Sequence, residues 1–353
     1  MKLRQEILGN VRCVVIKLGT GLLTDAQNQL ALPQIERLVE QFAALHQQEH
    51  QVLIVSSGAI GAGMAALDIK QRPKRLHELQ ACAAIGQSKL MAVYDDVFHW
   101  RGISVAQVLL THDDLKHRDR HLNARNTLLE LLARGVVPII NENDTVAVDE
   151  IKFGDNDRLA ALAATLIDAD LLIILSHVEG LLDRDGSVMP AVLEVNRDIE
   201  SLVGGTDRPT SVGGMKSKVE AAKIVARAGI PMIIASGERA NVLADLLAGE
   251  EVGTIFLPKT VKLKSRKRWI AFFQRSSGAL VVDEGAKRAL CDGGRSLLAK
   301  GIVTVEGKFS RGDVVAICDK NDVEFARGLA KVSSDKLTAE TGVVVHCNDL
   351  VIL

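Results

Sequence analysis

Residues 137–167, VPIINENDTVAVDEIKFGDNDRLAALAATLI, are the stretch that decides how this sequence is interpreted. An apolar, strand-like run ends abruptly in the acid–amide cluster NEND, residues 141–144. A second cluster, GDND at residues 154–157, leads directly into an alanine-rich segment that is typical of a helix. Because α/β proteins bind their ligands beyond the carboxyl ends of strands and at helix starts, the two clusters predict a ligand site.

Turn and cap formation explains only part of this pattern. Asn156 or Asp157 can cap a helix that begins near Arg158. The two clusters contain four acids and three amides, however, and Lys152, which lies between them, is the only base from residue 141 to residue 157. A solvated loop would also contain lysine and serine, so a binding site is the better interpretation.

The composition is that of a globular protein of 353 residues, long enough for two domains. Hydrophobic residues make up 47% and charged residues 25%, and the net charge of -1 gives no reason to expect attraction to nucleic acid or lipid. Five scattered cysteines without a CxxC pair indicate reduced thiols. No apolar run approaches the ~18 residues that cross a bilayer. The N-terminal MKLRQEILGN is too polar for a signal peptide and leads straight into a strand, so we expect a cytoplasmic protein.

Strand-like and helix-like segments alternate up to about residue 258. Apolar β-branched runs predict strands, and apolar residues spaced by three and four predict helices. The expected strands are residues 11–18, 52–55, 105–110, 136–140, 171–175 and 232–235. The expected helices are one opened by Pro33 and residues 121–134, 158–167 and 215–228. This order predicts an α/β fold whose mostly parallel central sheet is sandwiched by helices.

The pattern changes after residue 254. Short strand candidates at residues 279–282, 302–305, 313–317 and 324–329 alternate with glycine-rich turns and predict a small β-rich domain. We therefore expect one domain at residues 1–260, a basic linker at 261–268 and a second domain at 269–353. From residue 262 onward, 16 Lys and Arg face 11 Asp and Glu, and five of these bases lie in the linker. Charge therefore does not establish an RNA-binding face.

Three glycine-bearing segments lie where backbone N–H groups can bind an anion. KLGTG, residues 17–21, follows the first strand and adds a lysine. SSGAIGAG, residues 56–63, has GxxGxG spacing, unlike the GxGxxG of dinucleotide-binding folds, so it suits a carboxylate or phosphate; close helix packing is its structural alternative. VGGMKSK, residues 212–218, is not a Walker A loop. Its two lysines oppose the dipole of the following helix unless an anion binds there.

Together these segments suggest phosphoryl transfer. That chemistry needs cations along the nucleotide phosphates, a carboxylate-held Mg²⁺ and in-line positioning of the acceptor. The sequence contains no Ser/His/Asp or Cys/His nucleophile pattern. A carboxylate acceptor would explain this, because it is ionised at neutral pH and needs no general base.

The sequence closely resembles the glutamate 5-kinase family of the amino acid kinase superfamily over nearly its whole length. NEND followed by GDND, with the tail, separates this family from acetylglutamate, aspartate and uridylate kinases of the same fold. The matching segments are VVIKLGTG, VSSGAIGAG, AAIGQSKLM, NARNTL, VPIINENDTVA, EIKFGDND, GGMKSK, IIASG and GTIF. The segments that resemble a C-terminal PUA domain are RKRWI, VDEGAK, SLLAKGI and FSRGDVV.

The resemblance implies ATP-dependent phosphorylation of the L-glutamate side-chain carboxylate to L-glutamyl 5-phosphate, the first step of proline biosynthesis. It implies that Lys17 meets the ATP phosphates and that Lys218 stabilises charge on the transferred phosphoryl group. Asp157 would orient the lysines, and Mg²⁺ through water. No residue is assigned as a direct metal ligand.

The resemblance also implies binding residues for both substrates. Ser57, Asp144 and Asn156 match positions that hold glutamate, and their chemistry agrees, since an aspartate pairs with an α-ammonium and a hydroxyl with a carboxylate. The implied nucleotide contacts are Lys17, Gly19, Ser176, His177, Val212, Gly213, Gly214, Met215, Lys216, Ser217 and Lys218.

Two positions depart from the family pattern. Ser176-His177 replaces the usual Thr-Asp pair after the fifth strand, which keeps a hydrogen-bond donor but removes a carboxylate from the base and ribose contacts. Val212 replaces the threonine that often opens the glycine loop. The phosphate and acceptor groups remain, so we expect activity.

Two other functions stay open. One is another small-acid or phosphate kinase of the same fold. The other is an RNA-binding regulatory protein with a vestigial kinase site, which the neutral charge beyond the linker and the 3% of aromatic residues support only weakly. The resemblance also implies free proline as a feedback inhibitor and a homo-oligomer, dimer or tetramer. RNA binding by the PUA-like tail stays undecided, and no membrane partner is expected.

Overall fold

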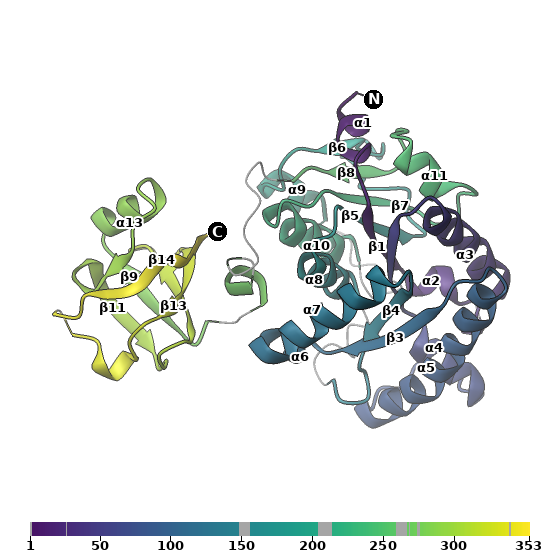
Figure 1. Cartoon of the computed structure of the whole chain (residues 1–353), viewed down its shortest axis with the longest axis horizontal. Helices are drawn as coiled ribbons and strands as arrows, with labels where there is room; N and C mark the ends of the chain where they lie inside the picture. Colours follow the sequence, from purple (N-terminus) through teal and green to yellow (C-terminus); the bar gives the residue numbers. More distant parts are fainter. Residues whose placement is uncertain are drawn as a thin grey trace. The chain divides into compact units, whose positions relative to one another are not determined.

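The computed structural model describes residues 2–25, 27–147, 156–203, 214–258, 267, 269–273, 276–338 and 340–353. The chain divides into two compact units, Met1–Lys262 and Leu263–Leu353 (Figure 1). The predicted linker at residues 261–268 lies outside the described residues except for Lys267. Within the described part of the chain, no helix combines the length and apolar character needed to cross a membrane.

The first unit is built on an eight-stranded sheet with the strand order β3-β4-β2-β1-β5-β7-β8-β6. Neighbouring strands pair in parallel except β7 with β8, which are antiparallel. The strands are β1 (Cys13–Leu18), β2 (Gln51–Val55), β3 (Val105–Leu110), β4 (Val137–Glu142), β5 (Leu171–Ser176), β6 (Ala191–Val192), β7 (Met232–Ser236) and β8 (Thr254–Phe256). The predicted α/β class with a mostly parallel sheet is confirmed, and each expected strand is present.

Helices cover both faces of this sheet, as predicted (Figure 1). The helices of one face are α7 (Arg118–Ala133), α8 (Asp157–Ile167) and α10 (Met215–Arg227). Those of the other are α3 (Leu32–Gln47), α5 (Leu76–His99) and α11 (Val242–Leu247). The shorter helices are α1 (Lys2–Leu8), α2 (Thr20–Leu23), α4 (Ala59–Ala66), α6 (His112–Lys116) and α9 (Arg197–Val203).

The central strand β1 sends alternate side chains to the two faces of the sheet. Val14, Ile16 and Leu18 are fully buried and join the hydrophobic core that α3 and α5 cover. Lys17 therefore points to the opposite face, where α8 packs against β1. This alternation directs the lysine toward the start of α8.

The N-terminal residues correct one expectation. The chain does not lead straight into a strand, because helix α1 precedes β1. Arg4 of this helix is buried and its guanidinium donates hydrogen bonds of 2.6–2.9 Å to four backbone carbonyl groups. These acceptors belong to Pro190, Glu250, Val252 and Gly253. Because these partners lie far away in the sequence, the local sequence did not indicate this helix.

Helices α4 and α5, which were not among the expected helices, pack backbone to backbone. A Cβ atom on Gly63 would lie 1.8 Å from the carbonyl oxygen of Cys82, and one on Gly86 would lie 1.7 Å from that of Ala59. Only glycine fits at such distances. The close-packing alternative for the SSGAIGAG segment is thus correct for Gly63.

The second unit contains a six-stranded sheet with the order β10-β14-β13-β12-β9-β11. The strands are β9 (Gly278–Val282), β10 (Leu297–Leu298), β11 (Ile302–Gly307), β12 (Val314–Cys318), β13 (Glu324–Ala330) and β14 (Val343–Ile352). Helix α13 (Glu284–Cys291) starts at Asp283, whose carboxylate accepts a 2.7 Å hydrogen bond from the Ala286 amide. A π-helix, η2 (Trp269–Phe273), precedes β9. The predicted small β-rich domain is confirmed.

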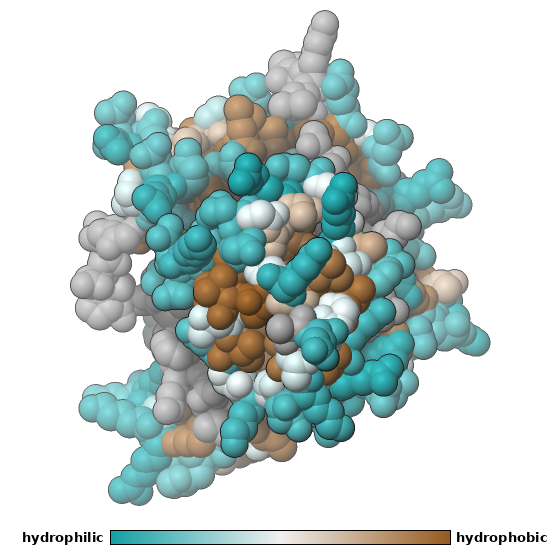
Figure 2. Space-filling model, turned by 90° about the vertical axis from the view of Figure 1, so that its left-hand side faces the viewer, coloured by the Kyte–Doolittle hydropathy of each residue, from teal (hydrophilic) through white to brown (hydrophobic). Residues whose placement is uncertain are grey.

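Apolar side chains gather in one area of the otherwise mostly hydrophilic face shown in Figure 2. Among the described residues, the most exposed large apolar side chains are Trp100, Leu193, Val146 and Val303, which come from separate parts of the chain. Single exposed apolar side chains are usual on protein surfaces. Neither observation assigns a function.

Candidate active site

The polar site lies where the carboxyl ends of the central strands meet. Lys17 is the penultimate residue of β1, Ser57 follows β2, Asn141 lies near the end of β4 and Ser176 ends β5. In the sheet β1 lies between β2 and β5; the chain runs from β1 to β2 on one side and crosses from β4 to β5 on the other. In open α/β sheets, ligands bind at such a switch point.

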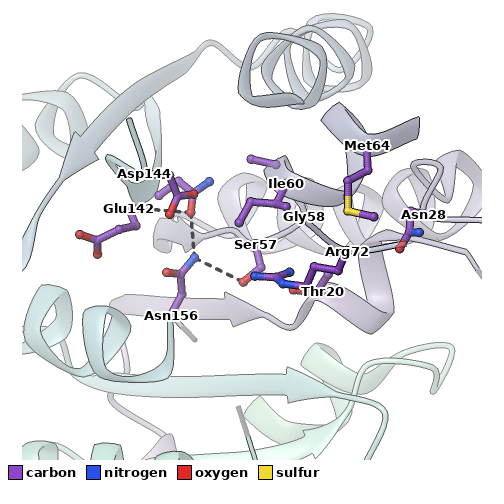
Figure 3. A pocket seen from close by; sticks show the side chains of 13 residues that line it. Thr20, Asn28, Ser57, Gly58, Ile60, Met64, Arg72, Glu142, Asp144 and Asn156 are labelled. Atoms are coloured by element: carbon purple, nitrogen blue, oxygen red, sulfur yellow. Dashed lines mark hydrogen bonds between the residues drawn. The ribbon is translucent and has the colours of Figure 1, made fainter. Parts of the chain in front are cut away.

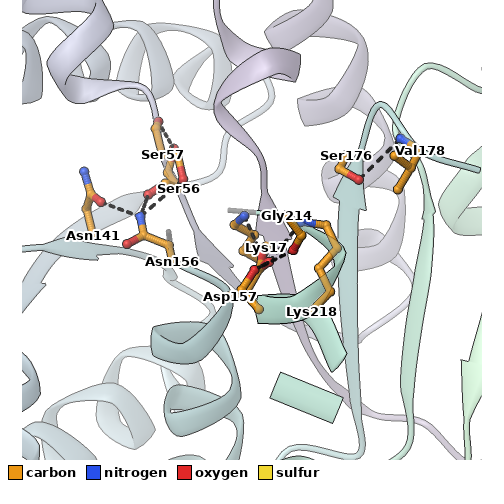
Figure 4. A network of polar contacts seen from close by, with 11 residues as sticks. Lys17, Ser56, Ser57, Asn141, Asn156, Asp157, Ser176, Val178, Gly214 and Lys218 are labelled. Atoms are coloured by element: carbon orange, nitrogen blue, oxygen red, sulfur yellow. Dashed lines mark hydrogen bonds and ion pairs between the residues drawn. The ribbon is translucent and has the colours of Figure 1, made fainter. Parts of the chain in front are cut away.

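Asp157 is the centre of the site (Figure 4). Its Oδ1 lies 2.6 Å from Lys17 Nζ, and its Oδ2 lies 2.9 Å from Lys218 Nζ. The Ser217 hydroxyl also lies 2.9 Å from Oδ2, as a donor. The structure thus brings together Lys17, Asp157 and Lys218, all buried, from β1, α8 and α10.

The two lysines keep the Asp157 carboxyl ionised. Desolvation by burial raises its pKa, but the charges and hydrogen bonds of Lys17 and Lys218 outweigh this and leave the pKa below its ordinary value. Among the described residues, two buried ammonium groups contact this one carboxylate. Buried cations held in this way suit an anionic ligand.

Asn156 organises the polar residues on the other side of Asp157. Its Nδ2 donates to the Ser56 carbonyl oxygen at 2.7 Å, to Asn141 Oδ1 at 2.8 Å and to Ser57 Oγ at 3.3 Å. An amide nitrogen has two hydrogens, so the long contact to Ser57 is the weakest of the three. In this contact the Ser57 oxygen is the acceptor, so the contact does not use the hydroxyl proton.

These contacts correct the capping interpretation. Asn156 occupies the N-cap position of α8, but its side chain makes no capping hydrogen bond. Asp157 is the first residue of the helix, and its carboxylate faces the lysines. Neither side chain caps α8, because each is held by partners from other segments. Gly154 and Asp155 of the second cluster lie outside the described residues.

A cavity of about 240 Å³ opens beside Asn156 (Figure 3). Polar and charged side chains line it together with apolar groups of α4. The lining residues are Thr20, Asn28, Ser57, Gly58, Ala59, Ile60, Gly61, Met64, Arg72, Asn141, Glu142, Asp144 and Asn156. All three predicted glutamate-binding residues, Ser57, Asp144 and Asn156, are among them. Asn156 is followed in the sequence by Asp157, which contacts the two lysines.

Gly58 forms the turn that carries Ser57 into this cavity. It precedes α4 with a φ of 99°, in the left-handed region that favours glycine. Further along the wall, burial raises the pKa of Asp144 to about 6, and the charge of Arg72 opposes the rise. Asp144 is therefore largely, though not wholly, ionised near neutral pH, and a bound cation would complete its ionisation.

Three of the predicted nucleotide residues, Gly19, Ser176 and His177, lie at the ends of β1 and β5. The Gly19 amide donates to the Leu175 carbonyl oxygen at 3.0 Å, and a Cβ on Gly19 would touch Ser176 at 3.6 Å. A Cβ on Gly21 would lie 3.8 Å from Nδ1 of the exposed His177. The strand ends of β1 and β5 therefore place Gly19, Ser176 and His177 together.

The N-cap residue of helix α10 is Gly214, which has no side chain to cap the helix, and a Cβ on it would meet no atom of the described residues within 4 Å. The first turn of the helix contains Met215, the exposed Lys216, Ser217 and Lys218. An uncapped helix start with basic residues suits a phosphate group. Two of the predicted loop contacts, Val212 and Gly213, lie outside the described residues.

Comparison with known proteins identifies the family. Residues 12–236 match the Amino acid kinase family, and residues 278–349 match the PUA domain. The chain is 42% identical to the glutamate 5-kinase of Pelobacter propionicus over 99% of this chain and 100% of that protein. It belongs to the glutamate 5-kinase family. The glutamate 5-kinase of Syntrophotalea carbinolica is 49% identical, with 95% of this chain and 91% of the relative covered.

A solved structure supports the fold of this glutamate 5-kinase family member. UMP kinase from Bacillus anthracis superposes with a TM-score of 0.50, covering 71% of this chain and 97% of that protein at 15% identity. At this identity the likeness shows the fold alone. The predicted amino acid kinase fold with a C-terminal PUA domain is thus confirmed.

Sequence reasoning missed two features of the site. Arg72 lines the cavity, but its surroundings, KQRPKR, have the composition of a solvated loop. Tyr94 is fully buried on α5, and its hydroxyl lies 2.9 Å from Ser56 Oγ, where it supports the turn that carries Ser57. Tyr94 is the only tyrosine of the chain, a weak signal that could have singled it out.

Proposed function

We propose that this chain transfers the γ-phosphoryl group of ATP to the side-chain carboxylate of L-glutamate, forming L-glutamyl 5-phosphate. Membership of the glutamate 5-kinase family supports this activity. The structural observation that carries it is the Lys17–Asp157–Lys218 cluster. Asn156, the residue before Asp157, lines a cavity of about 240 Å³ that suits an amino acid. This reaction opens proline biosynthesis.

The reaction needs positioned charge and no proton transfer. A glutamate carboxylate oxygen forms a bond to the γ-phosphorus while the bond from that phosphorus to the bridging oxygen of ADP breaks. Lys17 and Lys218 would stabilise the negative charge on the transferred group. Asp157, held at 2.6 Å and 2.9 Å from the two ammonium nitrogens, would fix their positions.

The cavity residues would bind the amino acid. The Asp144 carboxylate would pair with the α-ammonium group, and the hydroxyl of Ser57 would donate to a carboxylate. Asn156 would hold Ser57 and Asn141 in place through its side-chain amide. The next residue, Asp157, contacts the two lysines that would bind the phosphates, so the two binding regions would adjoin.

The described residues fit the triphosphate of ATP, since two buried lysines and the uncapped start of α10 face one region. Gly19, Ser176, His177 and residues 212–218 would surround the nucleotide. Mg²⁺ would enter with ATP and neutralise phosphate charge. No group of three or more potential metal ligands occurs in the part of the chain that the structure describes, and both Asp157 oxygens face lysines. Mg²⁺ would thus be bound mainly by the ATP phosphates and by water.

The test is an assay with purified protein, Mg-ATP and L-glutamate, in which hydroxylamine traps the acyl phosphate as hydroxamate. We expect hydroxamate and ADP in equal amounts only when glutamate is present. L-Aspartate, N-acetyl-L-glutamate and UMP serve as competing acceptors. Preference for one of these would favour another small-acid or phosphate kinase of this fold. Strong, salt-dependent RNA binding without glutamate-dependent ATP turnover would favour an RNA-binding regulatory role.

Two further properties belong to this proposal. Free proline, an amino acid that carries the same ammonium and carboxylate groups, would inhibit by competing near the glutamate cavity. The chain would act as a homo-oligomer, a dimer or tetramer. Assays with added proline and the molar mass in solution test these points, and RNA binding by the PUA domain stays undecided.

A further inference from the structure

Arg72 lies on the loop between α4 and α5 and lines the same cavity as Ser57 and Asp144. Figure 3 shows its side chain reaching toward Ser57 and Thr20. The family motifs do not include this arginine, and it follows no strand end. Its position nevertheless gives a positive charge to a wall that otherwise carries acids.

The two helices that flank this loop pack closely against each other. Helices α4 and α5 touch through Gly63 and Gly86, where any side chain would collide with backbone carbonyl groups. Pro73 follows Arg72 directly and restricts its backbone to extended conformations. The loop therefore starts and ends on a tightly packed helix pair, which keeps Arg72 over the cavity.

Charge balance shows what Arg72 can bind. Two acids, Glu142 and Asp144, line the cavity, and Arg72 is the only basic residue among the described lining residues. L-Glutamate brings one ammonium group and two carboxylates. Its side-chain carboxylate has to reach the Lys17–Asp157–Lys218 cluster to be phosphorylated. The α-carboxylate then lies in the cavity, where the two acids would repel it unless a cation is present.

On the basis of the proposed function, we propose that Arg72 binds the α-carboxylate of glutamate and selects substrates that carry one. The planar guanidinium can donate two parallel hydrogen bonds to a carboxylate. Asp144 and Arg72 then form a matched pair for the two charges on the α-carbon of an amino acid. The charge of Arg72 lowers the pKa of Asp144 against the rise that burial causes, which agrees with this arrangement.

The first test compares R72Q with R75Q. Arg75 belongs to the same loop, but its side chain is 74% exposed and does not line the cavity. It forms an ion pair with Glu78 at 3.9 Å. We expect R72Q to raise the glutamate KM about 10- to 100-fold, as expected for loss of a charge-assisted hydrogen bond, and to leave the ATP KM unchanged. R75Q should match the wild type in both.

A second substrate isolates the carboxylate. The α-amide of L-glutamate keeps the ammonium group and the side-chain carboxylate but lacks the α-carboxylate charge. Its inhibition constant against glutamate should be nearly the same in wild type and R72Q. An equal loss for glutamate and its α-amide would overturn the proposal, because it would mean that Arg72 only shapes the cavity.

Calorimetric titration with L-glutamate alone separates this inference from the proposed function. Binding by wild type and R75Q, with a 10-fold or greater loss in R72Q, supports the role of Arg72 whether or not ATP is turned over. Unchanged glutamate affinity in R72Q, or no glutamate binding by the wild type, overturns it. If the wild type is active and R72Q binds glutamate as tightly as the wild type does, the kinase function stands and only the proposed role of Arg72 is rejected.

Discussion

Lys218 lies 61 residues beyond Asp157 in the sequence, yet its ammonium nitrogen is 2.9 Å from the Asp157 carboxylate. The second oxygen of that carboxylate is 2.6 Å from Lys17, on a third segment of the chain. Asp157 has no solvent-exposed surface, and both lysines are buried. Among the described residues, one carboxylate therefore pairs with two buried cations, and its charge bears on both folding and catalysis.

Neutralising this carboxylate should destabilise the first unit. In D157N the amide keeps the shape of the side chain, but two buried ammonium groups lose their counter-charge. We expect a loss of about 3–5 kcal/mol in the free energy of unfolding, measured by urea denaturation. The matched control is D245N, which breaks a surface pair with Arg239 of 2.7 Å and should cost less than about 1 kcal/mol. Equal costs for the two variants would contradict the structural role.

Removing Lys218 should affect turnover more than folding. In K218A, Asp157 keeps Lys17 as its partner, so the ion pair that remains balances the charge. If Lys218 stabilises the transferred phosphoryl group, kcat should fall at least about 100-fold. K223A, on the outer part of the same helix where Lys223 pairs with Glu200, should stay near wild type. A K218A enzyme with near-normal kcat and an unaltered circular dichroism spectrum would refute the assigned role.

The sequence predicted the convergence of Lys17, Asp157 and Lys218 for a physical reason. Parallel strands all present their carboxyl ends at one edge of the sheet, so residues that follow different strands meet there. Continuous apolar runs identified those strands without knowledge of their order. The same rule brought Ser57 and Asn156 into one hydrogen-bond network.

Features that depend on distant partners could not be predicted. Helix α1 is anchored by Arg4 on carbonyl groups almost 250 residues away, which no local pattern reveals. Asn156 was expected to cap α8, but its amide binds groups of β2 and β4 segments instead. Arg72 has the local sequence of a solvated loop, and only the packing of α4 against α5 places it at the cavity.

Glutamate recognition should depend on pH through Asp144. Burial raises the pKa of Asp144 to about 6, and only its ionised form can pair with the α-ammonium group. Below pH 6 the Asp144 carboxyl becomes protonated, so kcat/KM for glutamate should decrease as the pH falls, by up to about tenfold per pH unit. Above pH 7 kcat/KM should be constant. The profile is measured between pH 5 and 8 with saturating ATP.

The variant D144N supplies the control for this profile. Its kcat/KM for glutamate should be low at all pH values and should lose the inflection near pH 6 that belongs to Asp144. Its ATP KM should stay near that of the wild type, because Asp144 lines only the amino acid cavity. An inflection that persists in D144N would assign the titration to another group.

The glycine contact between α4 and α5 should be intolerant of even one methyl group. In G86A the new Cβ would lie 1.7 Å from the Ala59 carbonyl oxygen, so the two helix backbones have to separate. We expect a loss of about 1–3 kcal/mol or more in unfolding free energy, despite the better helix propensity of alanine. In G342A the Cβ meets no atom within 4 Å, and the melting temperature should hardly change. Because the helix pair supports Arg72, G86A should also weaken glutamate binding, and a stable G86A protein with normal glutamate affinity would contradict this packing.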